Sequence, residues 1–308
     1  MIEARHLRVF RAVAKTGSFS AAARRLGCTQ PAVSQQMRAL EQSVGTPLLV
    51  RTGREMRLTE AGESLARHAV GILAGLTAAE EELAAIAGLR AGRVRLVSFP
   101  SGNSVLVPTA LAEMRAEHPA AQISLVEAEP PQSVEMLRAG DCEIALAFRY
   151  LDMPAAAAES AEDEWGDLVV RPLLTDRLVG LFPSRHRFAE EAQAGRPLEM
   201  AELAEEQWIA GCPRCRRHLV AVCEGAGFTP RIDFATDDYP AVAGLVGAGL
   251  GVAMLPELAL ESVHPKGVTF AEVRPAVRRE VVALTLPDLA RVPAVEAMLE
   301  QLVHAARR

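Results

Sequence analysis

Apolar residues recur at helical spacing along the first forty residues of the chain. Residues 3–15 show this pattern first, and residues 18–41 show it twice more, on either side of Gly27. A glycine after the last apolar residue commonly ends a helix, because it adopts the left-handed backbone conformation. The chain therefore begins with three predicted helices. The expected buried stripe of the first one is Leu7, Phe10, Val13 and Ala14.

The second and third predicted helices form a pair joined by a tight turn. Ser18 is placed to cap the second helix and Thr29 the third, and Pro31 is tolerated in a first turn. At about 100° per residue, each helix gathers its apolar residues on one face. These residues are Phe19, Ala22, Ala23 and Leu26 in the second helix, and Val33, Met37 and Leu40 in the third.

The other face of the third helix carries side chains of the types that contact bases. Glutamine can bond adenine bidentately, arginine can bond guanine, and serine can bond a base or a phosphate. Such a pair is a helix-turn-helix, although an ordinary helix pair with a solvated polar face would give the same pattern. The candidate DNA-binding residues in this segment are Ser18, Thr29, Gln30, Pro31, Ser34, Gln35 and Arg38.

Residues 47–63, PLLVRTGREMRLTEAGE, have the pattern of a short hairpin with Arg51, Arg54 and Arg57 at intervals of three. Arginines in a wing beside a recognition helix can hold phosphates or probe the minor groove. They would fix the register of the protein on DNA without specifying the sequence. We therefore expect residues 1–58 to form a winged helix-turn-helix domain that binds double-stranded DNA.

These segments resemble the LysR-type transcriptional regulators. The resemblance is carried by LRVFRAVAKTGSFSAAARRL, by TQPAVSQQMRALE and by the run from Arg51 to Gly62, and it is continuous over about the first 62 residues. It implies a homodimer, or a dimer of dimers, that binds an interrupted palindrome near a promoter. It also implies a small-molecule effector and RNA polymerase as further partners.

Residues 59–90 are predicted to form a long linker helix with a narrow apolar seam. The seam residues are spaced alternately by four and three, as in a heptad repeat. Such a seam buries little within one chain but much against a second copy, although a surface helix packing on its own domain is an alternative. The seam is Leu65, Ala69, Ile72, Leu76, Ala79, Leu83 and Ile86.

From residue 91 onward, strand-like and helical segments alternate, which predicts βαβ units and a parallel sheet. There is too much sheet for one small unit, so we expect two α/β subdomains with a crevice between them. The resemblance implies a two-lobed effector domain like the periplasmic binding proteins in residues 91–308. Lobe I would cover about 91–165 and 267–308, and lobe II about 166–266.

The expected fold class is thus a multidomain α+β chain. The alanine-rich, acidic residues 155–167 are predicted as a surface loop. Predicted strands include 93–98, 122–129, 142–148, 176–183, 207–211, 230–236, 251–256 and 279–287. Predicted helices of this part are near 104–117, 133–140, 214–226, 240–249 and 292–306.

Ligands of open α/β sheets bind beyond the carboxyl ends of strands, at helix N-termini. The polar loop 99–104 follows one such strand and could receive a carboxylate, although ordinary helix capping is the alternative. Arginines in the candidate set favour an anionic effector and aspartates oppose it, so the charge of the effector stays open. By position and by resemblance, the candidate effector-binding residues are Ser98, Phe99, Ser101, Asn103, Phe148, Arg149, Gly211, Cys212, Arg214, Thr236 and Asp237.

The pair Cys212 and Cys215 is not expected from the family and allows three interpretations. The thiols could form a redox switch, since C-x-x-C at a helix start near arginines lowers a thiol pKa. They could bind a metal, but a second C-x-x-C is absent. They could also be small residues that line the effector pocket. Cys28 and Cys142 are interpreted as small core residues.

Charge is distributed unevenly along the chain. Residues 1–58 carry ten Lys and Arg against three Asp and Glu, whereas the remainder carries 23 against 36. A basic head on an acidic body suits a protein that approaches DNA in one orientation. No apolar run reaches the roughly 18 residues that span a bilayer, and the charged N-terminus is not a secretory signal. We therefore expect a cytoplasmic protein without membrane contact.

Motifs of common enzyme classes are absent from the sequence. It holds no G-x-S-x-G, Walker loop, H-E-x-x-H or dinucleotide fingerprint, and its seven histidines are not paired at metal-ligand spacing. We expect a regulator and not an enzyme, and we assign no cofactor and no metal ligand. A freestanding solute-binding protein is the rival from another class, but the basic N-terminal segment counts against it.

Overall fold

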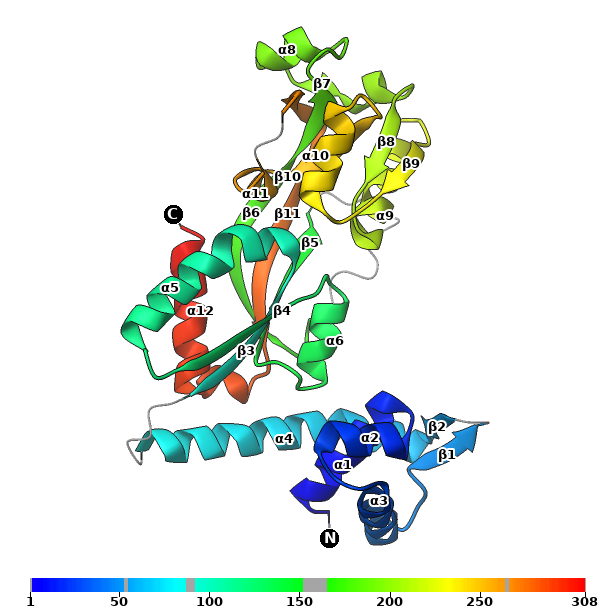
Figure 1. The fold of residues 1–308 in the computed structure, drawn as a ribbon, viewed down its shortest axis with the longest axis vertical. Helices are drawn as coiled ribbons and strands as arrows, with labels where there is room; N and C mark the ends of the chain where they lie inside the picture. Colours follow the sequence, from blue (N-terminus) through cyan, green and yellow to red (C-terminus); the bar gives the residue numbers. More distant parts are fainter. Residues whose placement is uncertain (1, 53–54, 87–91, 152–164, 264–265, 308) are drawn as a thin grey trace. The chain divides into compact units, whose positions relative to one another are not determined.

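The computed structural model describes residues 2–52, 55–86, 92–151, 165–263 and 266–307. The chain divides into a smaller compact unit, residues 1–89, and a larger one, residues 90–137 and 141–308. The smaller unit is helical with one hairpin, and the larger unit is built on a mixed sheet covered by helices (Figure 1). The predicted combination of a winged helix-turn-helix, a long helix and an α/β body is confirmed.

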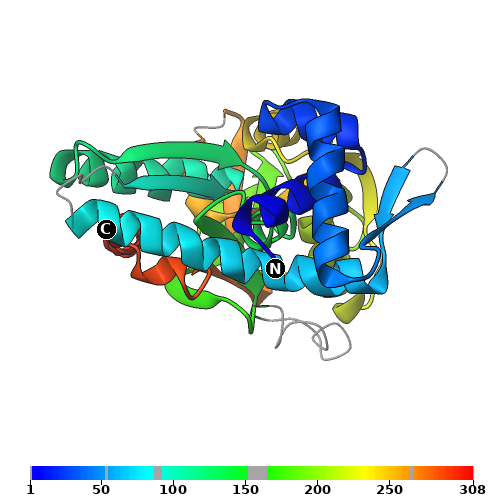
Figure 2. The same cartoon turned by 90° about the horizontal axis from the view of Figure 1, so that it is seen from below.

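The smaller unit contains the three predicted helices in the predicted places. Gly27, directly after the second helix, has φ 65°, which is the left-handed conformation expected at a helix end. The hairpin projects from these helices (Figure 2). The elements are α1 (Ala4–Thr16), α2 (Phe19–Leu26), α3 (Gln30–Val44), β1 (Leu49–Thr52), β2 (Glu55–Leu58) and α4 (Glu60–Ile86).

One hydrophobic core joins α1, α2 and α3. Phe10 of α1 and Leu40 of α3 are fully buried in it, together with Ala22 and Ala23 of α2. Burying a side chain of this size fully stabilises a fold by roughly 1.5–3 kcal/mol, so this core fixes the helix pair. Leu26, on the same helical face, is 39% exposed at the last turn of α2.

Helix α4 packs closely against the segment that leads into the hairpin. The Thr59 hydroxyl accepts a hydrogen bond from the Gly62 amide and donates one to the Pro47 carbonyl, which caps the helix and ties it to that segment. A Cβ atom at Gly62 would lie 2.1 Å from the Leu48 carbonyl oxygen. Glycine is therefore required here by the close approach of two backbones.

The predicted apolar seam of α4 is divided between two environments. Ala69 is fully buried in a cluster that includes Leu7 of α1, and Leu65 is partly buried against the same cluster. Farther along, Ile72 is 51% exposed and Leu83 is 66% exposed. The side chain of Ile86 lies outside the described residues. The first part of the seam therefore belongs to the core of the smaller unit, whereas Ile72 and Leu83 present apolar surface to solvent.

The larger unit contains a nine-stranded sheet with the order β4-β3-β5-β11-β6-β10-β8-β9, in which β7 pairs with β11 at one side. Its strands are β3 (Arg93–Ser98), β4 (Gln122–Glu127), β5 (Ile144–Tyr150), β6 (Val169–Pro183), β7 (Leu198–Glu199), β8 (Gln207–Ala210), β9 (Arg231–Ala235), β10 (Val252–Pro256) and β11 (Val268–Thr285). Its helices are η1 (Gly102–Leu106), α5 (Val107–Glu117), α6 (Gln132–Arg138), α8 (Ala189–Gln193), η2 (Met200–Leu203), α9 (Pro213–Gly225), α10 (Tyr239–Gly247), α11 (Glu257–Leu260), η3 (Leu289–Arg291) and α12 (Pro293–Ala305).

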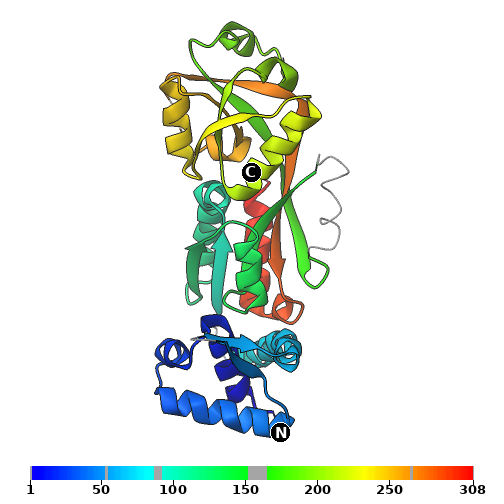
Figure 3. The ribbon, with the colours of Figure 1, turned by 90° about the vertical axis from the view of Figure 1, so that its right-hand side faces the viewer.

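The two longest strands, β6 and β11, run antiparallel through the whole unit (Figure 3). On one side, β5 pairs with β11 and continues the sheet to β3 and β4; on the other side, β10 pairs with β6 and continues it to β8 and β9. Each side thus forms one lobe, and the two long strands are common to both. This arrangement matches the expected pair of α/β subdomains.

Both long strands begin earlier than the sequence predicted. β6 starts at Val169, not at Asp176, and β11 starts at Val268, not at Arg279. Polar and proline residues interrupt the apolar alternation there, and a register shift between Glu272 and Val277 breaks the ladder of β11. The short elements β7, η2, α8, α11 and η3 were not predicted, since each is too brief for a periodic pattern.

The predicted surface loop 155–167 lies outside the described residues up to position 164. At its described end Trp165 is buried, 5% exposed, so this end packs into the body of the unit. Among the described residues, no helix is both long and apolar enough to cross a membrane.

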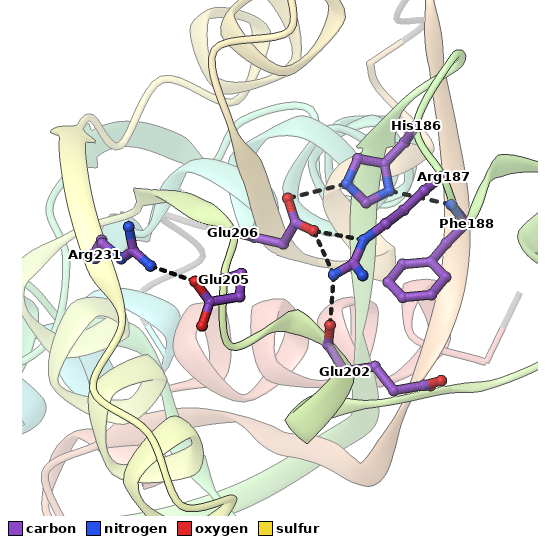
Figure 4. Close-up of polar contacts among 7 residues, drawn as sticks. All are labelled: His186, Arg187, Phe188, Glu202, Glu205, Glu206 and Arg231. Atoms are coloured by element: carbon purple, nitrogen blue, oxygen red, sulfur yellow. Dashed lines mark hydrogen bonds and ion pairs between the residues drawn. The ribbon is translucent and has the colours of Figure 1, made fainter.

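A polar cluster fixes the connection between β6 and β8 (Figure 4). The Glu206 carboxylate accepts hydrogen bonds from Arg187 at 2.8 Å and contacts the His186 Nε2 atom at 3.1 Å. Burial alone would raise the pKa of Glu206, but the hydrogen bonds from His186 and Arg187 outweigh it and lower that pKa. Arg187 also donates to the Glu202 carbonyl. We interpret the cluster as structural, because its groups satisfy one another.

The contact at Gly62 predicts that Gly62→Ala lowers the stability of the smaller unit by more than about 2 kcal/mol, because the new methyl group overlaps a backbone carbonyl. The matched control is Gly71→Ala in the same helix, where a Cβ atom would meet nothing within 4 Å. That variant should gain roughly 0.5–1 kcal/mol through helix propensity.

Circular dichroism during thermal unfolding measures both variants. Both tryptophans, Trp165 and Trp208, lie in the larger unit, so their fluorescence transition should stay unchanged in either variant. If Gly62→Ala and Gly71→Ala shift the helical transition equally, the proposed role of Gly62 is wrong.

Candidate functional site

Helix α3 of the smaller unit separates its apolar and polar residues cleanly. Val33 and Leu40 are fully buried and Met37 is 2% exposed, which confirms the predicted core face. The Thr29 hydroxyl accepts a hydrogen bond from the Ala32 amide at 3.4 Å and caps the helix, as predicted. Because one face is held in the core, the opposite face of α3 is turned to solvent.

The candidate DNA-binding residues of this segment fall into two groups. Ser18 and Thr29 cap α2 and α3, and the Ser18 hydroxyl accepts from the Ala21 amide at 3.5 Å. The others lie on the outer face of α3, where all are exposed except Ser34, which is half-buried: Gln30, Pro31, Ser34, Gln35 and Arg38. Cys28 is exposed in the turn before α3, so its interpretation as a core residue was wrong.

The wing is a two-stranded antiparallel hairpin. Arg51 lies opposite Met56, and Arg57 lies opposite Val50. Neighbouring residues of a strand point to opposite faces, so Arg51 and Arg57, which are both exposed, project from opposite faces of the hairpin. Arg54 lies outside the described residues.

The larger unit contains a cavity of about 400 Å³ in the crevice between its lobes. This volume lies within the range of pockets that hold small molecules. Its walls come from the end of β4 and the loop that follows, from the first turns of α9, and from the loop after β9. The charged and thiol side chains that line it are Glu127, Glu129, Cys212, Arg214, Arg217 and Asp237.

A second, much smaller cavity of about 30 Å³ shares Glu129, Cys212 and Asp237 with the first. Gly211, Tyr150 and other residues complete it. The structure therefore brings together four of the candidate effector residues at these cavities, namely Gly211, Cys212, Arg214 and Asp237.

Other candidate residues lie beneath or beside the cavities. Ser98, Phe99, Ser101 and Phe148 are fully buried, and the rings of Phe99 and Phe148 meet edge to face at 5.1 Å. Asn103 donates hydrogen bonds to the Glu127 carboxylate at 3.0 Å and to the Ser98 carbonyl. Arg149 bonds Glu280 at 2.7 Å, and Thr236 accepts from the Asp238 amide. These residues support the crevice through core packing and hydrogen bonds.

Sequence reasoning missed the charged pair at the floor of this region. Arg279 of β11 is 1% exposed and donates two hydrogen bonds to Asp176 of β6, at 2.7 and 2.9 Å. It also donates to the Ser101 hydroxyl at 2.8 Å. Its guanidinium carbon lies 4.6 Å from the centroid of the Phe148 ring. The partners are 103 positions apart in the sequence, so no local pattern could have predicted the pair.

The thiols of Cys212 and Cys215 lie 2.8 Å apart, and both cysteines are free. A hydrogen bond with Cys212 lowers the pKa of Cys215 to about 6; burial opposes this shift, and Tyr150 and Arg279 support it. The same shared proton raises the pKa of Cys212. Among the described residues, no three His, Cys, Asp or Glu side chains cluster as a metal site requires. Cys142 is fully buried, which confirms its interpretation as a core residue.

Glu129 is the most perturbed carboxyl group at the cavities. Burial raises its pKa to about 7, and the negative charges of Cys215, Asp237 and Glu127 add to the shift while Arg279 opposes it. Its Oε2 atom is buried and has no hydrogen-bond partner among the described residues. A buried oxygen of this kind is costly unless a ligand supplies a donor.

Comparison with known families matches both units. The family model described as the LysR substrate binding domain matches residues 87–307, and that of the bacterial regulatory helix-turn-helix protein, lysR family, matches residues 4–63. The chain belongs to the LysR family of transcriptional regulators. This LysR-type protein is accordingly a DNA-binding regulator with an effector-binding domain.

Curated relatives of the LysR-type chain cover most or nearly all of its length. The HTH-type transcriptional regulator AlsR of Bacillus subtilis is 30% identical over 84% of this chain and 82% of its own length. The regulator TfdS of Cupriavidus pinatubonensis is 30% identical over 97% of both chains.

Solved structures share its fold. A full-length OxyR variant from Pseudomonas aeruginosa has a TM-score of 0.73 at 20% identity, covering 98% of this chain and 95% of its own. The LysR family regulator CbnR in complex with its target DNA has a TM-score of 0.56 at 22% identity, covering 99% of this chain and 100% of its own.

The raised pKa of Glu129 predicts a pH-dependent stability of the larger unit. The folded state holds this proton more tightly than the unfolded chain, whose carboxyl pKa is near 4.5. The free energy of unfolding should therefore fall as pH rises from about 4.5 to 7 and then stay level. The contribution of this group to the fall is up to about 3 kcal/mol. Glu129→Gln should remove this decline.

Urea unfolding followed by tryptophan fluorescence, from pH 4.5 to 8, measures this effect. The matched control is Glu205→Gln, because Glu205 is a surface carboxyl that pairs with Arg231. It should keep the wild-type profile. A Glu129→Gln profile identical to that of wild type would contradict the assignment.

Proposed function

We propose that the outer face of α3 contacts bases in the major groove. The observation that carries this proposal is the exposure of Gln30, Gln35 and Arg38 on a helix whose other face is locked in the core. Ser34 is half-buried on the same outer face. These side-chain types match the hydrogen-bonding groups of base edges.

The arginines of the wing have a different role in this proposal. Arg51, Arg54 and Arg57 contact phosphates or the minor groove and fix the register on DNA without specifying sequence. The excess of ten basic over three acidic residues in positions 1–58 supports approach of this segment to DNA.

A homodimer is the proposed binding form. The exposed Ile72 and Leu83 of α4 offer apolar surface to the same helix of a second copy. Two helix-turn-helix domains related by a two-fold axis then fit an interrupted palindrome, whose half-sites lie on one side of the duplex. A dimer of dimers and contact with RNA polymerase are the further assemblies that the family suggests.

The proposed division of labour assigns residues 1–58 to DNA, 59–90 to dimerisation and 91–308 to the effector. The effector enters the crevice cavity and binds two arrangements of the lobes with different affinities. Binding therefore shifts the protein toward the arrangement that binds the effector more tightly. Acting on chromosomal DNA, the protein works in the cytoplasm, as a regulator and not as an enzyme. Effector binding is favoured over a redox switch at Cys212 and Cys215, because the matching family model describes a substrate-binding domain.

Two classes of arginine and glutamine variants test the DNA assignment. Gln30→Ala and Arg38→Ala should each weaken binding to the specific site by about 5- to 150-fold and relax base preference, since a bidentate base contact contributes about 1–3 kcal/mol. Arg51→Ala and Arg57→Ala should weaken binding to any sequence and lower the salt slope by roughly 1 each.

Footprinting and salt titrations with DNA from the upstream region of the gene, compared with random DNA, measure both effects. The matched control is Arg231→Ala, which removes a surface arginine of the larger unit that pairs with Glu205. It should bind as wild type does. Equal losses on random DNA from all four variants would refute the assignment.

A further inference from the structure

The crevice cavity carries opposite charges on different wall segments. Glu127 and Glu129 come from the end of β4 and the loop after it, and Asp237 comes from the loop after β9. Arg214 and Arg217 come from the first turns of α9. A ligand that fills the 400 Å³ between these segments must therefore satisfy both signs.

The acidic wall of the cavity, formed by Glu127, Glu129 and Asp237, contains a carboxylate oxygen without a hydrogen-bond donor among the described residues. Asn103 already bonds one oxygen of Glu127, at 3.0 Å, whereas the Oε2 atom of Glu129 is buried without a partner among the described residues. The negative charges of Asp237 and Glu127 both raise the pKa of Glu129. A group with several N–H donors and a positive charge would satisfy this wall, and an ammonium group has three such donors.

The basic wall favours a carboxylate. Arg214 and Arg217 lie one turn apart at the N-terminal end of the 13-residue helix α9, where the helix dipole also attracts an anion. The guanidinium carbon of Arg214 lies 5.7 Å from the centroid of the Phe148 ring, and that of Arg279 lies 4.6 Å from the same centroid. Arg279 is paired with Asp176 and does not line the cavity, so the positive charge of this wall comes from Arg214 and Arg217.

We infer that the effector is a free amino acid, with its ammonium group at Glu129, Glu127 and Asp237 and its carboxylate at Arg214 and the start of α9. A simple anion would face three carboxylates, and a simple cation would face two arginines, whereas a zwitterion pairs with both walls. The inference rests on the proposed function, because it takes the crevice cavity as the effector site.

The acidity of Glu129 gives the complex a characteristic pH dependence. The pKa of Glu129 is about 7 in the free protein, so an ammonium group that pairs with the ionised carboxylate binds more tightly at pH 8 than at pH 6. The other charged and titratable groups around it are Glu127, Asp237, Cys212, Cys215, Tyr150, Tyr239 and Arg279.

Thermal shift of the full-length protein against each of the twenty common amino acids tests the inference. One or more should raise the melting temperature by at least about 2 °C at saturating concentration. The N-acetyl derivative of that amino acid and the corresponding amine without a carboxylate should give no shift. Shifts from dicarboxylates or from putrescine without any from amino acids, or no shift from any amino acid, would overturn the inference.

Paired variants show whether the shift arises at the crevice. Glu129→Gln and Arg214→Gln should each weaken binding of the active amino acid at least tenfold, measured by calorimetry. Glu129→Gln should also reduce the difference in affinity between pH 6 and pH 8, to which Cys215, with a pKa of about 6, still contributes. The matched controls Glu205→Gln and Arg231→Gln remove a surface pair, joined at 2.8 Å elsewhere in the same unit, and should bind normally. Loss in the controls equal to that in the crevice variants would place the ligand elsewhere and overturn the inference.

Gel-shift titration with the upstream DNA, with and without the amino acid, separates this inference from the proposed function. DNA binding without any amino acid binding would leave the DNA assignment standing and overturn the ligand class. An amino acid that binds at the crevice without altering DNA affinity would support the ligand class and refute its role as effector.

Discussion

The larger unit depends on one buried ion pair, between Arg279 and Asp176. A guanidinium group that is 1% exposed carries its charge in a medium that solvates it poorly, so it requires a complete set of partners. The Asp176 carboxylate accepts two hydrogen bonds from Arg279 and one from the Leu258 amide at 3.0 Å. The pair joins β6 to β11, the two strands that both lobes share.

From this pair the crevice is built outward. Arg279 donates to Ser101 at the start of the helix after β3, and its guanidinium group lies against Phe99 and Phe148. The cavities lie next to this floor. The charge of Arg279 lowers the pKa of the Glu129 carboxyl group and of the Cys215 thiol. A residue that does not line the cavities therefore contributes to the electrostatics of the proposed effector site.

Sequence periodicity predicted the smaller unit well because its elements are local. The apolar face of α3, the glycine that ends α2 and the caps at Ser18 and Thr29 each depend on neighbours within about one turn. The error at Cys28 falls at the turn, where helical spacing no longer decides what is buried. At this turn the tertiary packing, not the pattern, determines exposure.

The larger unit was predictable as alternating strands and helices but not in its long-range pairings. The extensions of β6 and β11 and the pair of Asp176 with Arg279 depend on contacts about a hundred residues apart. The candidate effector residues were predicted from strand ends, but β5 continues to Tyr150, so Phe148 and Arg149 lie within a strand. However, which of them line a cavity and which lie beneath it was decided by side-chain packing. Gly211, Cys212, Arg214 and Asp237 line cavities, whereas Ser98, Phe99 and Phe148 are buried below.

The direct test of the buried pair is the unfolding free energy of Asp176→Asn in the full-length protein, followed by tryptophan fluorescence in urea. Removing one partner leaves the guanidinium charge buried, so the expected loss is about 3–5 kcal/mol. Asp233→Asn, at an exposed position of β9, is the matched control and should unfold as wild type does. The double variant Asp176→Leu with Arg279→Met should recover much of the loss. An Asp176→Asn protein within about 1 kcal/mol of wild type would contradict the central role of the pair.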